Sequence, residues 1–239
     1  MKSMILIQHC QSQHHVNAEA RLWPDGENGL TALGRRQAEC LASRLRDELD
    51  QMPCRLYASD MRRAYETADI IGKEIGQTTS RIPELREWNG RFAVERTQKG
   101  QERPTSDDNE APFDSRAFPE AETWREFYAR VSTGMQDLAR CHDPACLPIL
   151  VVHGGSKINI ITWWLQTTID AFPDKTPFAG MPGGITVLGT HRSGQPVVNR
   201  LNDVGHLDTC GIAPSLVTEV GGEPPTPPLG ESTGNQTAP

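Results

Sequence analysis

The chain has 239 residues, and its 24 lysines and arginines stand against 31 aspartates and glutamates, which gives a formal net charge of −7 at pH 7. This length predicts one domain of ordinary size, because a single core stops growing only beyond about 250–300 residues. The acidic balance argues against a nucleic-acid or anionic-membrane surface, which needs a basic face. It is compatible with a small anionic substrate, since a few nearby arginines outweigh a distant net charge.

No segment reaches the roughly 20 apolar residues of a membrane span. The first apolar run stops at Gln8, which is too short for a signal peptide, so we expect a cytoplasmic protein. The six cysteines show no paired spacing, and we expect them to be reduced, without a structural disulfide. Cys141, His142 and Cys146 match no usual zinc spacing.

The first half of the chain alternates between strand and helix patterns. Residues 4–7 form a continuous apolar run, which is typical of a buried strand. Over residues 30–49 leucines and alanines recur at helical spacing. Residues 55–59 predict a second strand, and residues 61–76 predict a second helix with Asp60 as its N-cap.

The second half opens with a polar excursion at residues 89–118. Pro119 predicts the start of a third helix that runs through Arg140. Residues 147–152 are the clearest buried strand, followed by a helix to about Thr168 and by strands at 185–188 and 196–201. This alternation predicts a three-layer α/β/α domain with a mostly parallel sheet over residues 1–210. The Pro/Gly-rich residues 211–239 predict a disordered tail.

Three predicted strands end in residues suited to bind an oxyanion. The first ends in Gln8-His9-Cys10, the second has Arg62-Arg63 in the turn that follows, and the third ends in His153-Gly154-Gly155. Ligands of open α/β sheets bind at the carboxyl ends of strands, and the glycines let backbone amides approach an anion. Either histidine alone is equally well explained as a hydrogen-bonded structural residue, but the coincidence of three strand ends favours a site.

Seven segments, in this order, resemble the histidine phosphatase superfamily, which has the phosphoglycerate-mutase-like fold. They are Gln8-His9-Cys10-Gln11-Ser12, LTALGRRQAE at 30–39, SDMRRAYETADII at 59–71, LREWNG at 85–90, AETW at 121–124, VVHGG at 151–155 and LNDVGHL at 201–207. The resemblance covers residues 4–208. Its last segment is closer to the small phosphatase branch than to the mutases.

The resemblance implies a phosphomonoester hydrolase that acts through a phosphohistidine. It implies that His9 accepts the phosphoryl group, that Glu87 protonates the leaving alkoxide and then activates water, and that Arg63 and His153 stabilise the phosphate oxygens. Further substrate-binding positions are implied at Gln8, Gln11, Ser12 and Gly154. The resemblance implies a small phosphorylated substrate and no metal or other cofactor, while substrate identity and oligomeric state stay open.

Plainer roles remain open for two of these residues. Glu87 is also explained as a solvated carboxylate paired with Arg86. Arg63 is also explained as a surface ion pair with Glu66 or Glu39.

The first motif departs from the family pattern. Gln8 stands where the family has arginine and Cys10 where it has glycine, while His15 falls on a family asparagine, with Asn17 nearby. A glutamine amide offers neutral donors in place of a charged, bidentate clamp. A charge-assisted hydrogen bond contributes about 1.5–3 kcal/mol, so its loss from the transition state alone slows turnover about 10–150-fold. We expect Cys10 to crowd the phosphate.

We consider Arg21 and Arg86 as candidates to supply the missing charge. Three interpretations follow: a slow or specialised phosphatase, which we favour, a degenerate family member that only binds a phosphorylated ligand or a protein, and another histidine-based reaction such as mutase-type transfer. A thiol nucleophile at Cys10 is disfavoured because Val16 occupies the position where a cysteine phosphatase needs arginine. A metal cluster of His9, Cys10, His14 and His15 is conceivable and disfavoured.

Overall fold

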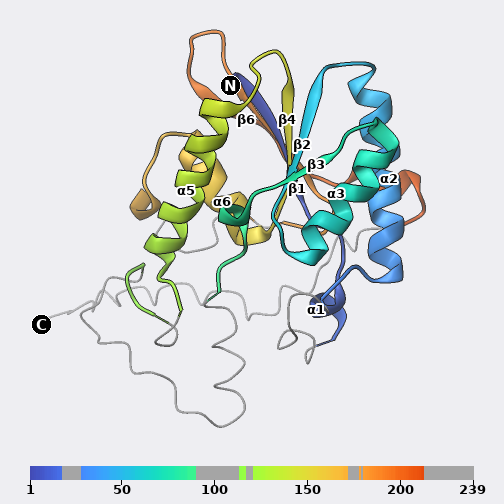
Figure 1. Ribbon diagram of the computed structural model, residues 1–239, viewed down its shortest axis with the longest axis horizontal. Coiled ribbons are helices and arrows are strands. Elements are labelled where there is room, and N and C mark those ends of the chain that lie inside the picture. Colours follow the sequence, from blue (N-terminus) through green and yellow to red (C-terminus); the bar gives the residue numbers. More distant parts are fainter. Residues whose placement is uncertain (18–27, 90–112, 117–120, 172–177, 179, 213–239) are drawn as a thin grey trace, which may run out of the picture.

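The computed structural model describes residues 1–17, 28–89, 113–116, 121–171, 178 and 180–212. Its centre is a six-stranded sheet in the order β3-β2-β4-β1-β5-β6 (Figure 1). The strands are β1 (Ser3–Gln8), β2 (Cys54–Ala58), β3 (Thr79–Arg81), β4 (Leu147–Val152), β5 (Ile185–Thr190) and β6 (Pro196–Asp203). The four strands from β3 to β1 are parallel, and β5 and β6 continue the sheet in antiparallel pairing.

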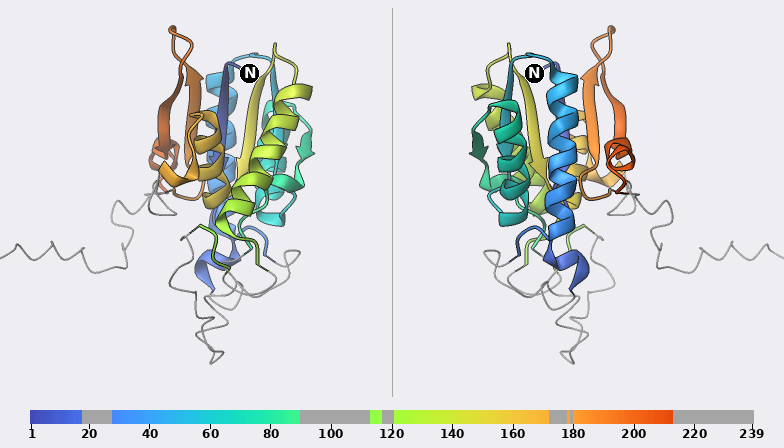
Figure 2. Two further views of the ribbon diagram at one scale, coloured as in Figure 1. Left: turned by 90° about the vertical axis from the view of Figure 1, so that its left-hand side faces the viewer. Right: turned by 90° about the vertical axis from the view of Figure 1, so that its right-hand side faces the viewer.

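Helices cover both faces of the sheet. They are α1 (Gln13–Val16), α2 (Ala32–Leu49), α3 (Arg62–Ile75), α5 (Trp124–Cys141), α6 (Gly154–Trp164) and α7 (Gly205–Thr209), with 3₁₀ turns at Pro83–Leu85 and Ile169–Ala171. In the left view of Figure 2, α5 and α6 lie in front of the sheet, and in the right view α2 lies in front of it. The three-layer α/β/α architecture expected from the alternating pattern is confirmed.

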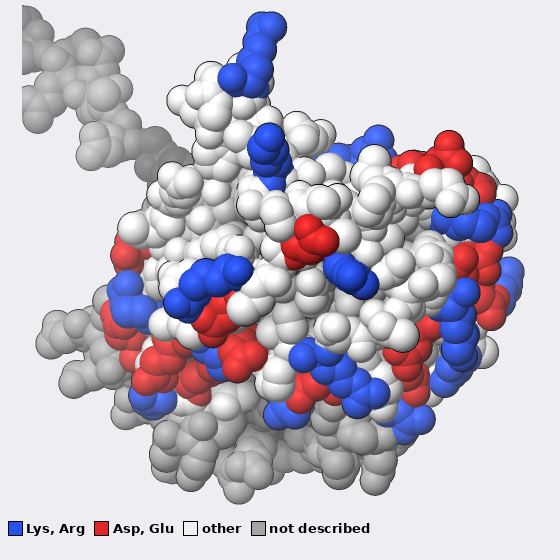
Figure 3. Space-filling view, turned by 45° about the horizontal axis from the view of Figure 1, so that its top comes forward, with Lys and Arg blue, Asp and Glu red and all other residues white. Residues whose placement is uncertain are grey.

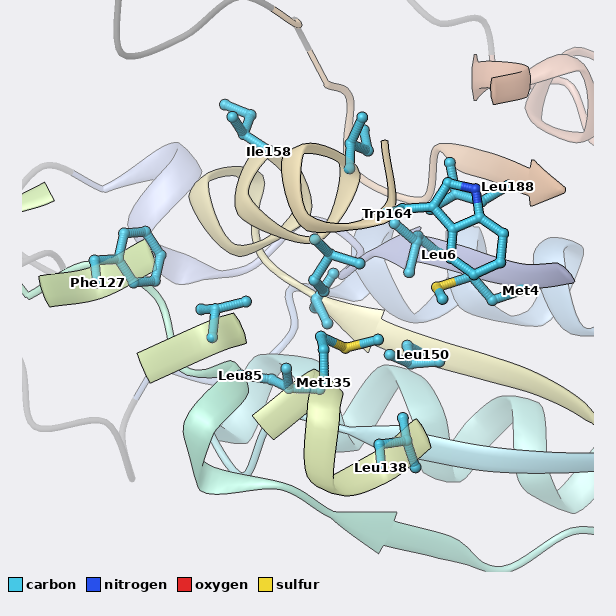
Figure 4. Packing of buried hydrophobic residues seen from close by; sticks show 14 of the residues in the cluster. Met4, Leu6, Leu85, Phe127, Met135, Leu138, Leu150, Ile158, Trp164 and Leu188 are labelled. Atoms are coloured by element: carbon cyan, nitrogen blue, oxygen red, sulfur yellow. The ribbon is translucent and has the colours of Figure 1, made fainter. Parts of the chain in front are cut away.

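Strand alternation divides the core between these two faces. Met4 and Leu6 of β1 face a cluster with α5 and α6, in which the Trp164 ring lies beside Met4, Leu6 and Leu188 (Figure 4). Ile7 faces the second cluster, which is formed with α2 and α3. Full burial of one such side chain contributes roughly 1.5–3 kcal/mol to the free energy of folding. Because β1 buries side chains on both faces, packing stabilises it from both sides of the sheet.

The bounds of three helices differ from those expected. Thr123 caps α5 in a reciprocal capping box with Glu126, so this helix begins at Trp124 and not near Pro119, which lies outside the described residues. Asp60 is not an N-cap, because α3 begins after Met61 and the Asp60 carboxylate instead accepts from Arg86. The helix predicted to reach Thr168 ends at Trp164.

One disulfide joins Cys40 on α2 to Cys210 directly after α7, and it corrects the expectation of reduced cysteines. Its partners are 170 residues apart, a separation that no local spacing can reveal. Beside it, Arg44 of α2 binds the Asp203 carboxylate at 2.6 Å and lies 3.5 Å from His206 Nδ1. The bond and the ion pair together fix the C-terminal helix against α2.

Acidic and basic side chains alternate on the face shown in Figure 3, where neither sign collects into one patch. None of the described helices combines the length and the apolar character needed to cross a membrane. Residues 213–239, most of the predicted tail, lie outside the described residues, and Ile212 just before them is buried.

Candidate active site

The three strand ends singled out in the sequence meet at one edge of the sheet. Because β4 lies between β2 and β1, the residues that follow these strands are neighbours. The amide of His9 donates to Val152 O at 2.9 Å, and the amide of Ser59 donates to Val151 O at 3.0 Å. The His9 and His153 rings then lie with their centroids 5.0 Å apart. In Figure 1 this edge is the lower end of the sheet, above α1.

Two hydrogen bonds fix the form of the His9 ring. Nδ1 lies 2.8 Å from the carbonyl oxygen of Cys10, so it carries the proton and donates it. Nε2 then has a lone pair, which accepts from Arg63 Nε at 3.2 Å. Burial first, and the Arg63 charge second, hold the His9 pKa well below its usual value. His9 is therefore a neutral imidazole whose nucleophilic nitrogen faces a guanidinium.

His153 is fully buried and has one ring nitrogen to spare. Its Nε2 lies 2.9 Å from Ser59 Oγ, whereas its Nδ1 has no hydrogen-bond partner among the described residues. Burial, followed by the Arg63 charge, holds the His153 pKa well below its usual value. Buried polar atoms in native proteins are nearly always satisfied, so an open nitrogen beside the His9 ring indicates a place for a ligand.

Arg63 reaches this space from the first turn of α3 and is buried. It does not pair with Glu66, because Arg62 binds that carboxylate at 2.7 Å and Arg35 approaches it from the other side. Glu66 also accepts from the amide of Leu30, which ties α3 to the start of α2. The surface ion pair considered for Arg63 therefore belongs to its neighbour.

Glu87 lies at the start of α6 instead of pairing with Arg86. Its Oε2 accepts from the amide of Gly155 at 3.0 Å and its Oε1 from the amide of Trp88 at 2.9 Å. The Arg86 guanidinium binds both oxygens of Asp60, at 2.6 and 2.7 Å. The carboxylate expected to act as acid is thus held by the helix that follows His153.

Gln8 and Gly154 complete the floor of the site. A Cβ placed on Gly154 would lie 3.9 Å from Glu87 Oε2 and 4.0 Å from Gln8 Oε1, so the amide and the carboxylate flank this glycine. Gln8 is itself buried, and its Oε1 accepts from Lys157 Nζ at 3.2 Å.

Lys157 also reaches the site, although none of the sequence motifs includes it. It is fully buried within α6 and is the one charged residue of that helix, GGSKINIITWW. Burial lowers its pKa to about 8, while the Glu87 carboxylate acts in the opposite direction. A single lysine in an otherwise uncharged helix was the available signal.

Gln11 and Ser12 shape the loop after β1. Gln11 Oε1 accepts from Thr31 Oγ1 at 2.7 Å, and the Gln11 carbonyl lies so close to α2 that a Cβ on Gly34 would be 1.9 Å from it. Ser12 caps α1, and its hydroxyl lies 2.7 Å from His14 Nδ1. Both residues hold the loop in place, and direct contact with substrate stays a prediction for them.

Cys10 does not crowd the site as expected. Its side chain belongs to the buried cluster with Ile7 and Leu30, and its amide donates to Thr67 Oγ1 at 3.1 Å. Burial raises the pKa of the Cys10 thiol to about 12, so it is protonated at neutral pH. The burial of the sulfur and its raised pKa both disfavour a thiolate nucleophile at this position.

His9, His14 and His15 each place a ring nitrogen within 4.8 Å of the others, a spacing compatible with a metal ion. Cys10 is not part of this group, and the Arg63 guanidinium on His9 Nε2 opposes a cation there. Among the candidates for the missing charge, Arg86 is committed to Asp60, and Arg21 lies outside the described residues.

Comparison with known proteins agrees with this geometry. The profile of the histidine phosphatase superfamily (branch 1) matches residues 4–204. The chain is 31% identical over 170 residues to the probable phosphoglycerate mutase GpmB of Yersinia pestis, which covers 68% of this chain and 69% of that protein.

Two solved structures have the same fold. A mycobacterial glucosyl-3-phosphoglycerate phosphatase in a complex with VO3 superposes with a TM-score of 0.65 at 20% identity, over 84% of this chain and 99% of its own. Phosphoserine phosphatase from Entamoeba histolytica, in complex with 3-phosphoglyceric acid, gives a TM-score of 0.64 at 20% identity, over 87% and 100%. With the family match over most of its length, the chain belongs to the histidine phosphatase superfamily, branch 1.

Proposed function

We propose that this protein hydrolyses phosphate monoesters, with His9 as the residue that accepts the phosphoryl group. The observation that carries the proposal is the His9 ring itself, neutral, with Nδ1–H held by Cys10 O and Nε2 facing Arg63. The open Nδ1 of His153 beside it supports a bound anion. A neutral imidazole next to a fixed guanidinium is both nucleophilic and matched to a phosphate.

The reaction has two steps. The Nε2 lone pair of His9 attacks phosphorus, the ester P–O bond breaks, and the departing alkoxide takes a proton from the carboxyl group of Glu87. Water then attacks the phosphohistidine and gives a proton back to Glu87, the P–N bond breaks, and inorganic phosphate leaves. Arg63 and His153 stabilise the equatorial oxygens in both steps, which calls for no metal ion.

The substrate is proposed to be a small phosphorylated metabolite. The proteins of like fold are named for phosphoserine and for glucosyl-3-phosphoglycerate, and both compounds carry a carboxylate beside the phosphate ester. The 31% identity to a probable phosphoglycerate mutase favours, as second candidate, transfer of the phosphoryl group to a hydroxyl instead of water.

A panel of phosphate esters distinguishes these functions. EDTA-treated protein should release inorganic phosphate from at least one of p-nitrophenyl phosphate, phosphoserine and 3-phosphoglycerate. Rapid quenching should show a phosphoryl mass shift on the peptide that contains His9, and His9→Asn should abolish both signals. A mutase would instead convert 3-phosphoglycerate to its isomer without releasing phosphate.

Activity that survives in His9→Asn, or that disappears with the chelator, would contradict the proposal. A wild type that binds phosphate without labelling His9 would correspond to the degenerate, binding-only family member. The expected cytoplasmic location stays a prediction, and the Cys40–Cys210 disulfide weighs against it, because disulfides persist mainly in oxidising compartments.

A further inference from the structure

Lys157 is a buried cation with an unusual partner. Its side chain is fully buried in α6, and the acceptor for its ammonium group among the described residues is the amide oxygen of Gln8, at 3.2 Å. Burying a charge is costly unless it is paired, and a neutral amide is a weak partner for an ammonium group. A structural role alone does not explain why an otherwise uncharged helix carries this buried charge next to the end of β1.

The lysine also decides how the Gln8 amide is oriented. An ammonium group can only donate hydrogen bonds, so the oxygen of the amide has to face Lys157. The Nε2 hydrogens of Gln8 are then directed away from the lysine, at the position that directly precedes His9. An ammonium group on the oxygen polarises the amide and makes its N–H a stronger donor.

The backbone at Gly180 packs closely against the Lys157–Gln8 pair. A Cβ on Gly180 would lie 2.1 Å from both Lys157 Nζ and Gln8 Oε1, so a residue without a side chain is needed there. Gly154, with Glu87 beyond it, lies on the side of the active site. The pair is therefore enclosed between the backbone at residue 180 and the floor of the active site.

We propose that Lys157 and Gln8 together replace the arginine that the family pattern has at position 8. Lys157 holds the positive charge, and Gln8 passes its effect to the substrate by donating an Nε2 hydrogen to a phosphate oxygen. This inference rests on the proposed function, because it assumes that a phosphate ester occupies the space beside His9. Lys157 is a positioning residue in this scheme, since it acts on the substrate through Gln8.

Other charged groups near α6 are already committed. This helix packs against α5, β1 and β6, and β1 carries no charged residue. The charged residues of α5 and β6 are held in ion pairs with other residues: Arg125 with Asp114 and Asp170, Glu126 with Arg116, Arg130 with Glu122, Arg140 with Asp137, and Arg200 and Asp203 with each other. Glu87 is the described acidic group whose field reaches Lys157, while His9 and His153 are held neutral.

Four variants test the charge relay: Lys157→Met, Gln8→Arg, the double variant of both, and Gln8→Glu. Lys157→Met should lower kcat/KM by about 10–150-fold, the range for one charge-assisted hydrogen bond, with most of the loss in kcat. Gln8→Arg alone should give no gain, because it brings a second cation against Lys157. The double variant should recover most of the activity lost in Lys157→Met, since it moves the charge to position 8.

The pH profile separates this role from a structural one. Wild-type kcat/KM should fall as pH rises through about 8, where the Lys157 ammonium loses its proton. This alkaline limb should be absent from the double variant, because arginine does not titrate in that range. Gln8→Glu should stay folded through an ion pair with Lys157 and yet bind inorganic phosphate at least about tenfold more weakly, because its carboxylate repels the anion.

Three outcomes would overturn the relay: Gln8→Arg alone accelerates turnover, Lys157→Met leaves kcat/KM unchanged, or the double variant keeps the alkaline limb. Calorimetry with inorganic phosphate separates these results from failure of the proposed function. If the wild type binds phosphate tightly at pH 7, Lys157→Met binds it weakly, and the wild type hydrolyses no ester, then the relay is supported and the proposed hydrolase function is wrong. If Lys157→Met hydrolyses esters as fast as the wild type, the hydrolase function is supported and the relay is wrong.

Discussion

The two histidines of the site differ in the ring nitrogen that each leaves for chemistry. His9 donates a hydrogen bond from Nδ1 to the Cys10 carbonyl, which leaves Nε2 for the reaction. His153 forms a hydrogen bond with Ser59 through Nε2, which leaves Nδ1 for a ligand. Burial holds both pKa values well below normal, so both rings are neutral over the physiological range. Since neither ring contributes a charge, the positive potential of the site comes, within the described part of the chain, mainly from Arg63 and Lys157, and Arg130 adds to it at His153.

Glu87 should matter in proportion to how poor the leaving group is. Glu87→Gln keeps a similar shape but cannot deliver a proton, so hydrolysis of an alkyl phosphate should fall about 10²–10⁴-fold. With p-nitrophenyl phosphate, whose leaving group needs no proton, the first step should be much less affected, as a burst of p-nitrophenol would show. Glu84→Gln, three residues earlier, is the matched control and should lose little with either substrate.

A Cys10→Ala variant tests whether the cysteine of the altered motif takes part in the reaction or only in packing. Because burial raises the thiol pKa to about 12, the sulfur is not a nucleophile near pH 7. Cys10→Ala should therefore leave kcat/KM within about threefold and cost about 1 kcal/mol of stability for the lost packing. A loss of activity as large as that of His9→Asn, measured on folded protein, would give the thiol a role in the reaction.

At the scale of elements, α6 brings the site together. It follows His153 directly, its first turn offers the Gly155 amide to Glu87, and Lys157 in its second turn reaches Gln8 of β1. Three strand ends and one helix thus converge because β4 pairs with both β1 and β2.

The first two residues of α6 should respond differently to a single methyl group. A Cβ on Gly155 would lie 2.3 Å from Glu87 Oε1 and 2.9 Å from the Phe127 ring, so Gly155→Ala should displace Glu87. We expect it to lower stability by about 1–3 kcal/mol and to slow hydrolysis of alkyl phosphates. Gly154→Ala meets nothing closer than 3.9 Å and should change the melting temperature little. Equal melting temperatures for the two variants would contradict this packing.

Local patterns predicted the elements better than their ends. The strands at 4–7, 55–59 and 147–152 and the approach of His9 to His153 followed from apolar runs and from the geometry of parallel strands. The start of α5 was misplaced, although Thr123 and Glu126 have capping-box spacing, because a proline nearby also suits a first turn. Lys157 and the disulfide were missed because their partners, Gln8 and Cys40, are 149 and 170 residues away.

At the scale of the whole molecule, the Cys40–Cys210 bond should supply much of the stability. Closing a loop of this length removes enough entropy from the unfolded chain to contribute about 5 kcal/mol in the loop-closure model, and measured values run about 2–5 kcal/mol. Reductant should lower the melting temperature of the wild type. It should have no further effect on the double variant Cys40→Ser, Cys210→Ser, which serves as the control. If reductant leaves the wild type unchanged, the bond contributes nothing to folding.

Two titratable residues near the disulfide, His206 and Asp203, should make the free energy of unfolding decrease in acid. Burial, with Arg44 second, lowers the His206 pKa to about 4, while the unfolded value is about 6.5. The unfolded chain therefore binds the proton first, and stability should be full above pH 6.5 and decline as pH falls towards 4. Below that, the Asp203 carboxylate, whose pKa Arg44 lowers to about 2, should add a further loss. Urea titrations at pH 7.5 and 5 should show a smaller difference for His206→Asn than for the wild type.

The disulfide also divides the chain into a covalent ring and two arms outside it, one before Cys40 and one after Cys210. A protease that cuts once between Cys40 and Cys210 opens the ring but releases neither piece, so a gel without reductant should show one band and a gel with reductant two. His9, directly after β1, belongs to the arm before Cys40. Non-covalent contacts hold it there: the ladders of β1 with β4 and β5, the packing of β1, and hydrogen bonds to Val152 and Arg63. One cut between residues 10 and 39 would therefore leave His9 and Gln8 on a fragment without a covalent link to Arg63, Glu87, His153 and Lys157, and this fragment could leave once those contacts open.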